Sequence, residues 1–285
     1  MMKVLRIISV LSLACICFCS CKVNDNPVEA GDTVRVMSYN IRYGTANDGD
    51  NSWEKRKAAT PEMLMNTAPD IFGVQEALQS QIKYITVNCP QYKSYGVGRD
   101  DGKTQGECMA IFYNTDKVSL VDCGTYWLSE TPDTPSKGWD AACYRTATWA
   151  LLEMKAGGKR FFYVNTHLDH KGVEARTKGL ALIVKKIADM NPDNLPMILT
   201  GDFNVTPDDA CLTDLDVIMF SARKAAEVTD NTRTYNGYKN TGGSVIDYIY
   251  FSGFSKCKDF RVVNETYAGK PYISDHYPIV STLIF

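Results

Sequence analysis

The order of short apolar segments restricts the fold most, because many of them follow one another with no helical segment in between. From residue 33 onwards, about ten segments have a strand pattern and three or four a helical one. The expected strands are residues 33–40, 70–75, 108–113, 117–121, 147–154, 160–166, 196–200, 245–251, 256–263 and 278–284. The expected helices are residues 53–66, 78–88 and 173–190. Runs of consecutive strands indicate antiparallel sheets with helices packed outside, and not the regular strand–helix alternation of a barrel.

Polar side chains stand where several of these strands end or begin, and Asp247 stands inside the expected strand 245–251. They are Asn40, Glu76, His167, Asp202, Asn204, Asp247, Asp275 and His276. Each alone has an ordinary structural explanation, such as a turn cap for Asn40 or an Asx-turn for Asp202. However, all three histidines of the chain, His167, His170 and His276, lie in these segments. Site residues collect on loops at strand ends, so the set is interpreted as one site.

The residue types in this set indicate metal-assisted hydrolysis of a phosphate ester. Carboxylate and amide oxygens are hard ligands that suit Mg²⁺, Mn²⁺ or Ca²⁺, and the sequence has no zinc-type spacing of histidines or cysteines. A histidine held by a carboxylate can orient or deprotonate a water molecule near neutral pH. A metal, an activated water and donors to phosphate oxygens together make up a phosphate-ester hydrolase.

Six short motifs occur in a fixed order along the chain. They are residues 37–42 (MSYNIR), 75–76 (QE), 165–168 (NTHL), 201–204 (GDFN), 246–248 (IDY) and 274–278 (SDHYP). In this order and spacing they resemble the endonuclease/exonuclease/phosphatase superfamily, the fold of DNase I and of exonuclease III-type repair nucleases. The resemblance covers residues 33–285 and implies a four-layer α/β sandwich, in which two mainly antiparallel sheets pack face to face with helices outside. It also implies a site in a cleft at one end of the sandwich.

The resemblance assigns three of these residues to a metal site. Glu76 is expected to be the principal ligand, helped by Asn40, and Asp275 matches a position in the metal region of some members. The ion implied is Mg²⁺ or Mn²⁺, and whether one ion or two bind stays open.

The other motif residues are assigned to catalysis. His276, paired with Asp247, is expected to act either as the general base or as a donor to the phosphate. Asp202 is expected to orient or deprotonate the attacking water, and Asn204 to donate to the scissile phosphate. His167 is expected to stabilise the phosphate or protonate the leaving oxygen. No serine, cysteine or threonine stands where a nucleophile is needed, so no covalent intermediate is expected.

Flanking residues have weaker assignments. Arg145 precedes a strand and is expected to bind a phosphate oxygen, with an exposed salt bridge as the alternative. His170 is expected either to contact the substrate or to cap the following helix. Trp53, Glu54 and Arg56 are candidates for the rim of the cleft, and plain packing is the alternative for Trp53.

The substrate is open between nucleic acid or nucleotide, phospholipid headgroup, and sugar or inositol phosphate. Arg42 stands where repair nucleases often have aspartate, and residues 106–112 lack their Tyr-Ser-Gly pattern, which argues against abasic-site repair. Lys plus Arg total 31 and Asp plus Glu 33, so the net charge of −2 gives no support for bulk electrostatic binding of nucleic acid. A non-catalytic binding lipoprotein is a remote alternative, because the whole metal and histidine set is present.

The first residues have the pattern of an export signal. Lys3 and Arg6 precede a 13-residue apolar run, residues 7–19, which is shorter than the about 20 residues that span a bilayer. Residues 18–22 (FCSCK) resemble a bacterial lipoprotein cleavage site with Cys21 as the lipidated residue, and an ordinary secretory signal is the alternative. The expected organisation is a signal in residues 1–20, a tether in 21–32 and the catalytic domain in 33–285. This predicts a monomer at the bacterial envelope that contacts the membrane only through a lipid anchor, with a net charge of −4 after loss of Lys3 and Arg6.

Six cysteines remain beyond Cys21, and they are expected to be buried free thiols with at most one disulfide.

Overall fold

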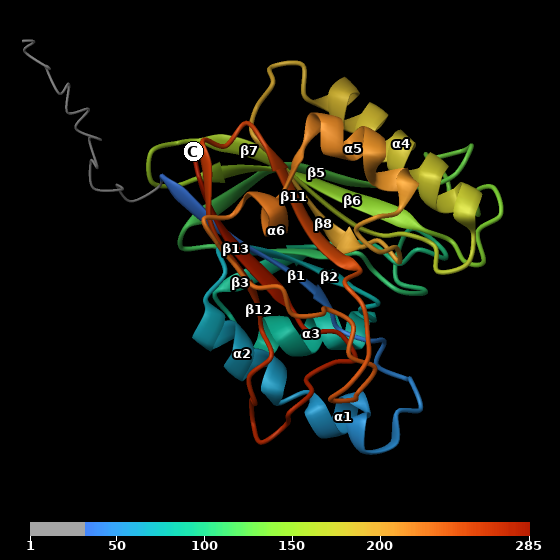
Figure 1. The fold of residues 1–285 in the computed structure, drawn as a ribbon, viewed down its shortest axis with the longest axis vertical. Helices are drawn as coiled ribbons and strands as arrows, with labels where there is room; N and C mark the ends of the chain where they lie inside the picture. The colour runs from blue at the N-terminus through green and yellow to red at the C-terminus, as the bar shows by residue number, and fades with distance from the viewer. Residues whose placement is uncertain (1–31) are drawn as a thin grey trace, which may run out of the picture.

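Two β-sheets packed face to face form the centre of the molecule (Figure 1). The computed structural model describes residues 32–285, so the expected signal, Cys21 and the tether up to residue 31 lie outside the described residues. One sheet has seven strands, in the order β10 (Val228–Thr229), β12 (Lys256–Val262), β13 (Ile279–Ile284), β1 (Thr33–Asn40), β2 (Ile71–Gln75), β4 (Ile111–Asn114) and β3 (Tyr92–Tyr95). The other has six, in the order β5 (Val118–Trp127), β6 (Thr146–Met154), β7 (Arg160–His167), β8 (Met197–Asp202), β11 (Asp247–Ser252) and β9 (Phe220–Ser221).

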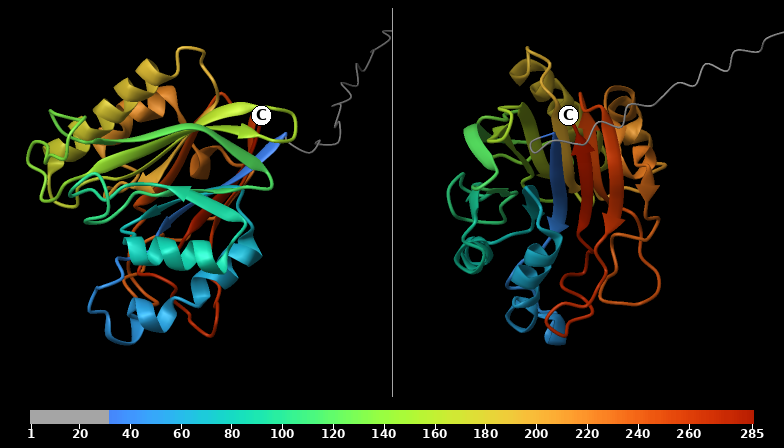
Figure 2. Two further views of the ribbon diagram at one scale, coloured as in Figure 1. Left: turned by 180° about the vertical axis from the view of Figure 1, so that it is seen from behind. Right: turned by 90° about the vertical axis from the view of Figure 1, so that its left-hand side faces the viewer.

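The longer helices cover the outer faces of the two sheets, as Figure 2 shows. The helices α1 (Trp53–Arg56), α2 (Ala59–Thr67) and α3 (Gln79–Asn88) lie on the side of the seven-stranded sheet. The helices α4 (Val173–Met190) and α5 (Thr213–Ile218) lie on the side of the six-stranded sheet. The short α6 (Ala222–Ala225) packs near β11 and β12. The expected four-layer α/β sandwich is therefore confirmed, with mainly antiparallel pairing; within residues 32–285 the parallel pairs are β1–β2, β7–β8 and β10–β12.

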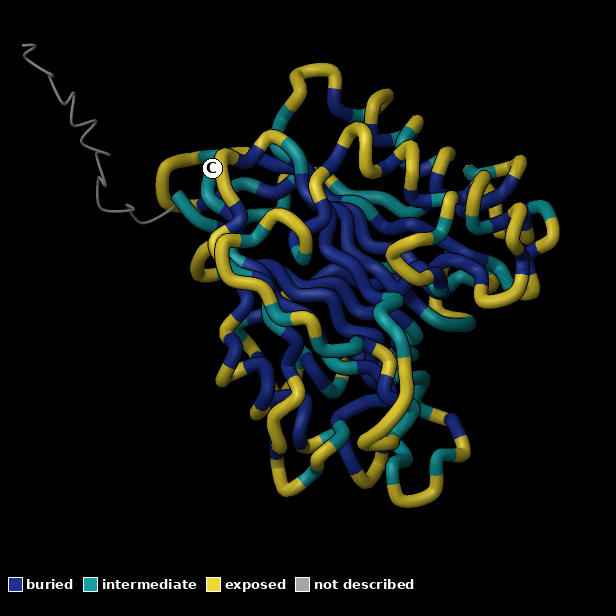
Figure 3. The backbone as a smooth tube through the Cα atoms, viewed as in Figure 1, coloured by how far each residue is buried: buried dark blue, intermediate teal, exposed yellow. Residues whose placement is uncertain are grey.

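Alternation along β1 shows how the sequence builds these layers. Val34 and Val36 point into the core between the sheets, whereas Met37 and Tyr39 pack with the helices outside. A strand that carries apolar residues on both of its faces needs a packed layer on each side to bury them. The strands are accordingly buried along most of their length, while exposed residues lie in loops and on outer helix faces (Figure 3).

Strand register brings the polar strand ends together. In the parallel pair of β1 and β2, Asn40 lies opposite Gln75, so Glu76 follows directly beside it. In the six-stranded sheet, Asp202 at the end of β8 lies between His167 of β7 and Asp247 of β11. Because β1, β2, β7 and β8 all end at the same end of the sandwich, the residues that follow them surround one space.

A buried polar network joins the two sheets just below this space. The Gln75 side-chain amide donates to Asn165 Oδ1 over 2.7 Å, and Asn165 Nδ2 donates to the Val74 carbonyl of the opposite sheet over 2.9 Å. Thr200 Oγ1 also donates to Asn165 Oδ1, over 3.1 Å. The close approach requires glycine at position 73, since a Cβ there would lie 2.4 Å from the Asn165 side chain. The network fixes the distance between the two halves of the site.

Some element boundaries differ from the prediction. The expected helix 53–66 is divided into α1 and α2, since the ring of Pro61 would clash with the Lys57 carbonyl of a continuous helix. Strand β5 extends to Trp127 and not to residue 121, because a bulge between Leu120 and Asp122 restores its pairing with β6. The short elements β3, β9, β10, α5 and α6 were not expected.

Two further observations concern the described residues as a whole. All six cysteines there are free thiols, and Cys89, Cys108 and Cys257 are buried. No helix in that part of the chain combines the length and the apolarity needed to cross a bilayer.

Candidate active site

A cavity of about 650 Å³ opens at the end of the sandwich where the polar strand ends meet. Residues from both sheets and from the loops between them line it. They are Arg42, Tyr43, Glu76, Arg99, Glu107, Cys143, Arg145, His167, His170, Asp202, Asn204, Tyr235, Ser244, Ile246, Asp275 and His276. Of the residues expected in the site, Asn40 and Asp247 lie behind this wall and contact its members.

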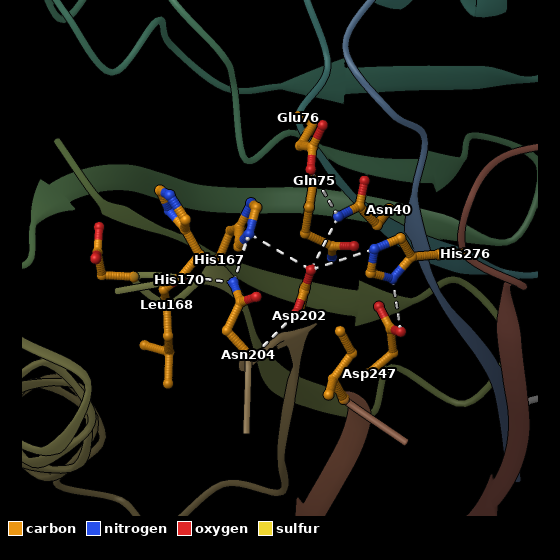
Figure 4. Close-up of polar contacts among 12 residues, drawn as sticks. Asn40, Gln75, Glu76, His167, Leu168, His170, Asp202, Asn204, Asp247 and His276 are labelled. Atoms are coloured by element: carbon orange, nitrogen blue, oxygen red, sulfur yellow. Dashed lines mark hydrogen bonds and ion pairs between the residues drawn. The ribbon is translucent and has the colours of Figure 1, made fainter. Parts of the chain in front are cut away.

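Asp202 is at the centre of the polar contacts (Figure 4). Its Oδ2 accepts a 3.0 Å hydrogen bond from Asn40 Nδ2, and its Oδ1 accepts one of 2.9 Å from the Asn204 backbone N–H. The same Oδ2 lies 3.4 Å from His167 Nε2 and 3.7 Å from His276 Nε2. Burial raises the pKa of Asp202 to about 7. The positive charge of His276 lowers the pKa by less than burial raises it, and the negative charge of Asp247 raises it further. A carboxylate with that pKa suits proton transfer near neutral pH.

His276 is held by Asp247. Its Nδ1 lies 2.9 Å from Asp247 Oδ2, and the ring stacks edge-on against Tyr235 with centroids 5.0 Å apart. Burial alone would lower the pKa of His276, but the attraction of Asp247 and Asp202 outweighs burial and raises it to about 10. His276 is therefore a cation at neutral pH. It can donate a hydrogen bond from Nε2, but it cannot accept a proton, because both ring nitrogens are already protonated.

His167 has the opposite electrostatic environment. Burial, together with the positive charge of Arg145, keeps the pKa of His167 well below its ordinary value, so the ring is neutral. Asn204 Nδ2 donates to His167 Nε2 and to the Leu168 carbonyl, both over 3.0 Å. The ring proton is then on Nδ1, which is buried without a hydrogen-bond partner among the described residues. Two histidines of one cavity thus differ in charge because their neighbours differ in charge.

Arg145 and His170 form a further part of the wall. Arg145 is 5% exposed, so the alternative of an exposed salt bridge is wrong. Its Nε donates to Asp169 Oδ2 over 3.3 Å, and its Nη2 lies 3.0 Å from His170 Nδ1. Its Nη1 is buried without a partner among the described residues, which leaves one donor for a ligand. His170 does not cap α4, since Asp140 accepts from the first-turn Ala175 N–H over 2.7 Å.

Glu76 and Asp275 offer carboxylates to the cavity on the side of the seven-stranded sheet. Glu76 has a left-handed backbone (φ 61°), and the Tyr43 N–H donates to its Oε2 over 3.1 Å. Burial raises the pKa of Asp275, and the negative charge of Glu76 raises it further, partly offset by His276 and Arg42. Arg42 Nη1 lies 3.7 Å from Asp275 Oδ2 and compensates part of this charge. Two neighbouring hard carboxylates fit an Mg²⁺-type ion, which takes one or two carboxylates together with water and phosphate oxygens.

Asn40 lies beside the expected metal site with its amide turned away from a ligand role. Its Nδ2 donates to Glu76 Oε1 over 3.1 Å as well as to Asp202, and its Oδ1 accepts from the Arg42 N–H over 3.0 Å. In this geometry Asn40 positions both carboxylates. Its expected role as a ligand stays a prediction.

The three rim candidates lie elsewhere. Trp53 is buried and packs against Tyr84, so the packing alternative holds, and the exposed Glu54 pairs with Lys57. Arg56 is buried beneath the site, where its guanidinium donates to the backbone carbonyls of Asn51, Arg42 and Ile273. Arg56 therefore holds together the loops that carry Arg42 and Asp275.

Arg99 and Glu107 line the cavity although the motifs did not include them, and Arg42, the last residue of the motif 37–42, lines it although it was given no role in the site. Arg42 has φ 58° and donates to both carboxylate oxygens of Asp48, over 3.1 and 3.0 Å. Arg99 and Glu107 lie in a loop, and no local pattern distinguishes them from other charged loop residues. The glycines at positions 98, 102 and 106 were the available signal for a tight loop.

A sandwich of this topology, with carboxylates, amides and histidines at one end, defines a class of enzymes that hydrolyse phosphate esters. The chain belongs to the endonuclease/exonuclease/phosphatase family, whose model matches residues 37–276.

Two solved structures from Bacteroides thetaiotaomicron are similar over nearly the whole domain. A mannosyl-6-phosphatase is 35% identical, with a TM-score of 0.85 and coverage of 88% of this chain and 100% of that one. An endonuclease/exonuclease/phosphatase family protein is 36% identical, with a TM-score of 0.84 and coverage of 89% and 98%.

Among characterised sequences, Nocturnin from Drosophila melanogaster is 28% identical over 211 residues. That match covers 65% of this chain but only 31% of Nocturnin, so the chain corresponds to about a third of that protein.

Proposed function

We propose that this hydrolase is a divalent-metal-dependent phosphatase that removes phosphate from a sugar phosphate by direct attack of water. The observation that carries the proposal is the placement of His276 Nε2 3.7 Å from Asp202 Oδ2, two buried groups whose pKa values are both raised, to about 10 for His276 and to about 7 for Asp202. When the surroundings of two groups give them different pKa values, the group with the lower pKa can act as a base while the other stays protonated as a charged hydrogen-bond donor.

Glu76 and Asp275 would hold the metal, with Asn40 keeping the Glu76 carboxylate in place. A bound Mg²⁺ or Mn²⁺ ion supplies Lewis-acid stabilisation of the charge on the phosphate oxygens.

Asp202, when ionised, orients the attacking water and accepts its proton. His276 is already protonated at neutral pH, so it donates a charged hydrogen bond to a phosphate oxygen while Asp247 holds its ring. The unpaired Arg145 Nη1 supplies a further donor on the side of His167, whereas both hydrogens of the Asn204 amide are already donated to His167 and Leu168. These donors are in place before the reaction, so they stabilise the transition state without reorganisation.

The cavity lining favours a polar monoester among the substrates left open. Ile246 is the one aliphatic side chain among the lining residues, and most of the others are charged or polar, which does not favour the acyl chains of a phospholipid. The net charge of −2 does not favour a nucleic acid either. A mannosyl-6-phosphatase at 35% identity supports a sugar as the alcohol part.

A substrate panel tests the proposal. It should contain mannose 6-phosphate, glucose 6-phosphate, p-nitrophenyl phosphate, bis-p-nitrophenyl phosphate, sphingomyelin, RNA and plasmid DNA, each with Mg²⁺, with Mn²⁺ and with EDTA. We expect metal-dependent release of phosphate from the monoesters. Preference for a diester, or activity that survives both EDTA and His276→Ala, would overturn the mechanism.

We also propose that the mature protein is anchored at the bacterial envelope through a lipid on Cys21. The basic start, the short apolar run and the cysteine after Ser20 support this. Expression of the full chain and of Cys21→Ser, followed by membrane fractionation, tests it. Release of the variant to the soluble fraction is expected, and equal membrane retention of both would contradict it.

A further inference from the structure

Three chain segments beyond the ends of β2, β3 and β4 are joined by two isolated β-bridges and contribute to one wall of the cavity. Cys108 pairs with Ala77 on one side and with Gly98 on the other, and the Cys108 N–H donates to the Ala77 carbonyl over 2.7 Å. In this register Arg99 lies opposite Glu107, and the Arg99 N–H donates to the Glu107 carbonyl over 3.0 Å. Cys108 and Ala77 point into the core, so their neighbours Arg99 and Glu107 point to the other side, into the cavity.

The two side chains form an ion pair that keeps hydrogen-bonding capacity for a ligand. Arg99 Nη1 donates to Glu107 Oε2 over 2.7 Å, and the side chains are only 14% and 16% exposed. Arg99 Nε is buried without a hydrogen bond and lies 3.7 Å from Asp100 Oδ1. The bond from Arg99 uses only Oε2 of Glu107. A guanidinium donor and a carboxylate acceptor are therefore available side by side.

The loop does not need this pair for its own shape. The Gly98 N–H donates to the Lys103 carbonyl and the Asp100 N–H to the Gln105 carbonyl, over 3.0 and 3.1 Å. Trp127 Nε1 also donates to the Arg99 carbonyl over 2.7 Å. Taking a charged pair out of water offsets much of its own attraction, so a pair in this position contributes little to stability. A role in ligand binding accounts for its place in the wall.

We propose that Arg99 and Glu107 are the specificity-determining residues that bind two neighbouring hydroxyl groups of the alcohol part of the substrate. Glu107 accepts hydrogen bonds from the hydroxyls, and Arg99 donates to their oxygens. Such a donor–acceptor pair matches a polyhydroxylated alcohol, because each hydroxyl is both donor and acceptor. The pair has no net charge and its carboxylate faces the cavity, so it would not favour a second phosphate group. The inference rests on the proposed phosphatase function and adds to it how the sugar is recognised.

The test compares substrates with and without hydroxyl groups in matched variants. Steady-state rates are measured for mannose 6-phosphate, its monodeoxy analogues and p-nitrophenyl phosphate, with wild type, Glu107→Gln, Arg99→Lys and Glu107→Asp. Glu153→Gln is the control, because Glu153 forms a comparable pair with Arg160 over 2.6 Å on the surface. We expect Glu107→Gln to lower kcat/KM for mannose 6-phosphate about 10- to 100-fold, mainly through KM, and to change p-nitrophenyl phosphate less than about threefold.

Each outcome decides between the two proposals. Wild type that cleaves no monoester contradicts the proposed function, and the inference falls with it. If wild type is active and Glu107→Gln loses activity equally on both substrates, the inference is overturned but the proposed function is not. Glu107 would then support the catalytic groups. If Glu107→Gln does not fold, the wild-type protein with the deoxy analogues still tests the inference. At least one monodeoxy analogue should have a kcat/KM about 10-fold below that of mannose 6-phosphate. Equal kcat/KM values for all of these substrates would overturn the inference.

Discussion

His276 and Asp247 share a 2.9 Å hydrogen bond that connects the two sheets at the active end of the sandwich. Asp247 begins β11 of the six-stranded sheet, and His276 lies in the loop before β13 of the seven-stranded sheet. The bond therefore depends on the packing of the sheets as well as on the two residues. It holds the His276 ring next to Asp202 and contributes to the raised pKa of His276.

Replacement Asp247→Asn should lower kcat about 100-fold or more, because His276 loses the carboxylate that orients it and keeps it charged. KM should change much less. Steady-state kinetics on the best monoester of the panel measures both, with Asp133→Asn, an exposed aspartate, as the control. A kcat within a factor of about three of wild type would show that the bond has no part in catalysis.

The free energy of unfolding of the metal-free protein should fall as the pH rises from about 6.5 to 10. The folded-state pKa of His276 is raised above the ordinary value of 6.5, so its protonation stabilises the fold fully below pH 6.5, and that contribution is lost through pH 10. We expect a loss of more than about 2 kcal/mol, since one pKa unit corresponds to about 1.4 kcal/mol. Urea unfolding in EDTA at pH 6.5, 8 and 10 measures it. His276→Gln should lose clearly less over the same range, and identical pH dependence in the two proteins would argue against the assigned charge.

Metal binding should be visible without any substrate. Mg²⁺ or Mn²⁺ should raise the melting temperature of wild type, because an ion that binds only the folded state stabilises it. Glu76→Gln and Asp275→Asn should lose most of that rise, whereas the exposed Glu54→Gln should keep it. Differential scanning fluorimetry with a metal titration gives the result. An unchanged metal response in Glu76→Gln would place the ion elsewhere.

Arg145→Lys should weaken phosphate binding by about 10-fold while the protein stays folded, because the ammonium can still pair with Asp169 but cannot offer the donor on Nη1. Inhibition by inorganic phosphate measures the effect separately from turnover. Arg160→Lys, a surface pair with Glu153, is the matched control. Equal inhibition constants in wild type and Arg145→Lys would remove Arg145 from the phosphate site.

Arg56→Met should destabilise the protein by about 2–4 kcal/mol, since three backbone carbonyls lose a buried charged donor. Urea unfolding measures the change, and Lys57→Met, a partly exposed neighbour, should have an effect below about 0.5 kcal/mol. Residual activity should fall too, because the loops that carry Arg42 and Asp275 lose their common support. A stability equal to wild type would show that the loops hold their places without it.

The two-sheet architecture could be predicted because its signals are local. The alternation Val34, Val36 in β1 specifies a strand whatever lies next to it, and runs of such strands favour sheets covered by helices. Boundaries were less predictable. The bulge after Leu120 depends on pairing with β6, which lies more than twenty residues away in the chain.

Most members of the candidate site could also be predicted, because they occupy strand ends in ordered motifs. Arg99 and Glu107 could not be assigned, since their direction follows from the pairing of Ala77, Cys108 and Gly98, segments separated in the chain. Arg56 was placed at the rim although it lies beneath it, because the carbonyls that it reaches belong to two connections far apart in the chain, between β1 and α1 and before β13.

The amino-acid sequence by itself determined which residues could do the chemistry, because residue type and strand-end position are properties of the chain. Only the tertiary structure decided their charge states and partners. Asp202, His167 and His276 have pKa values shifted in different directions, and the causes are burial and neighbours that come from both sheets. Electrostatic interactions depend on distance and on exclusion of water, and both are set by packing.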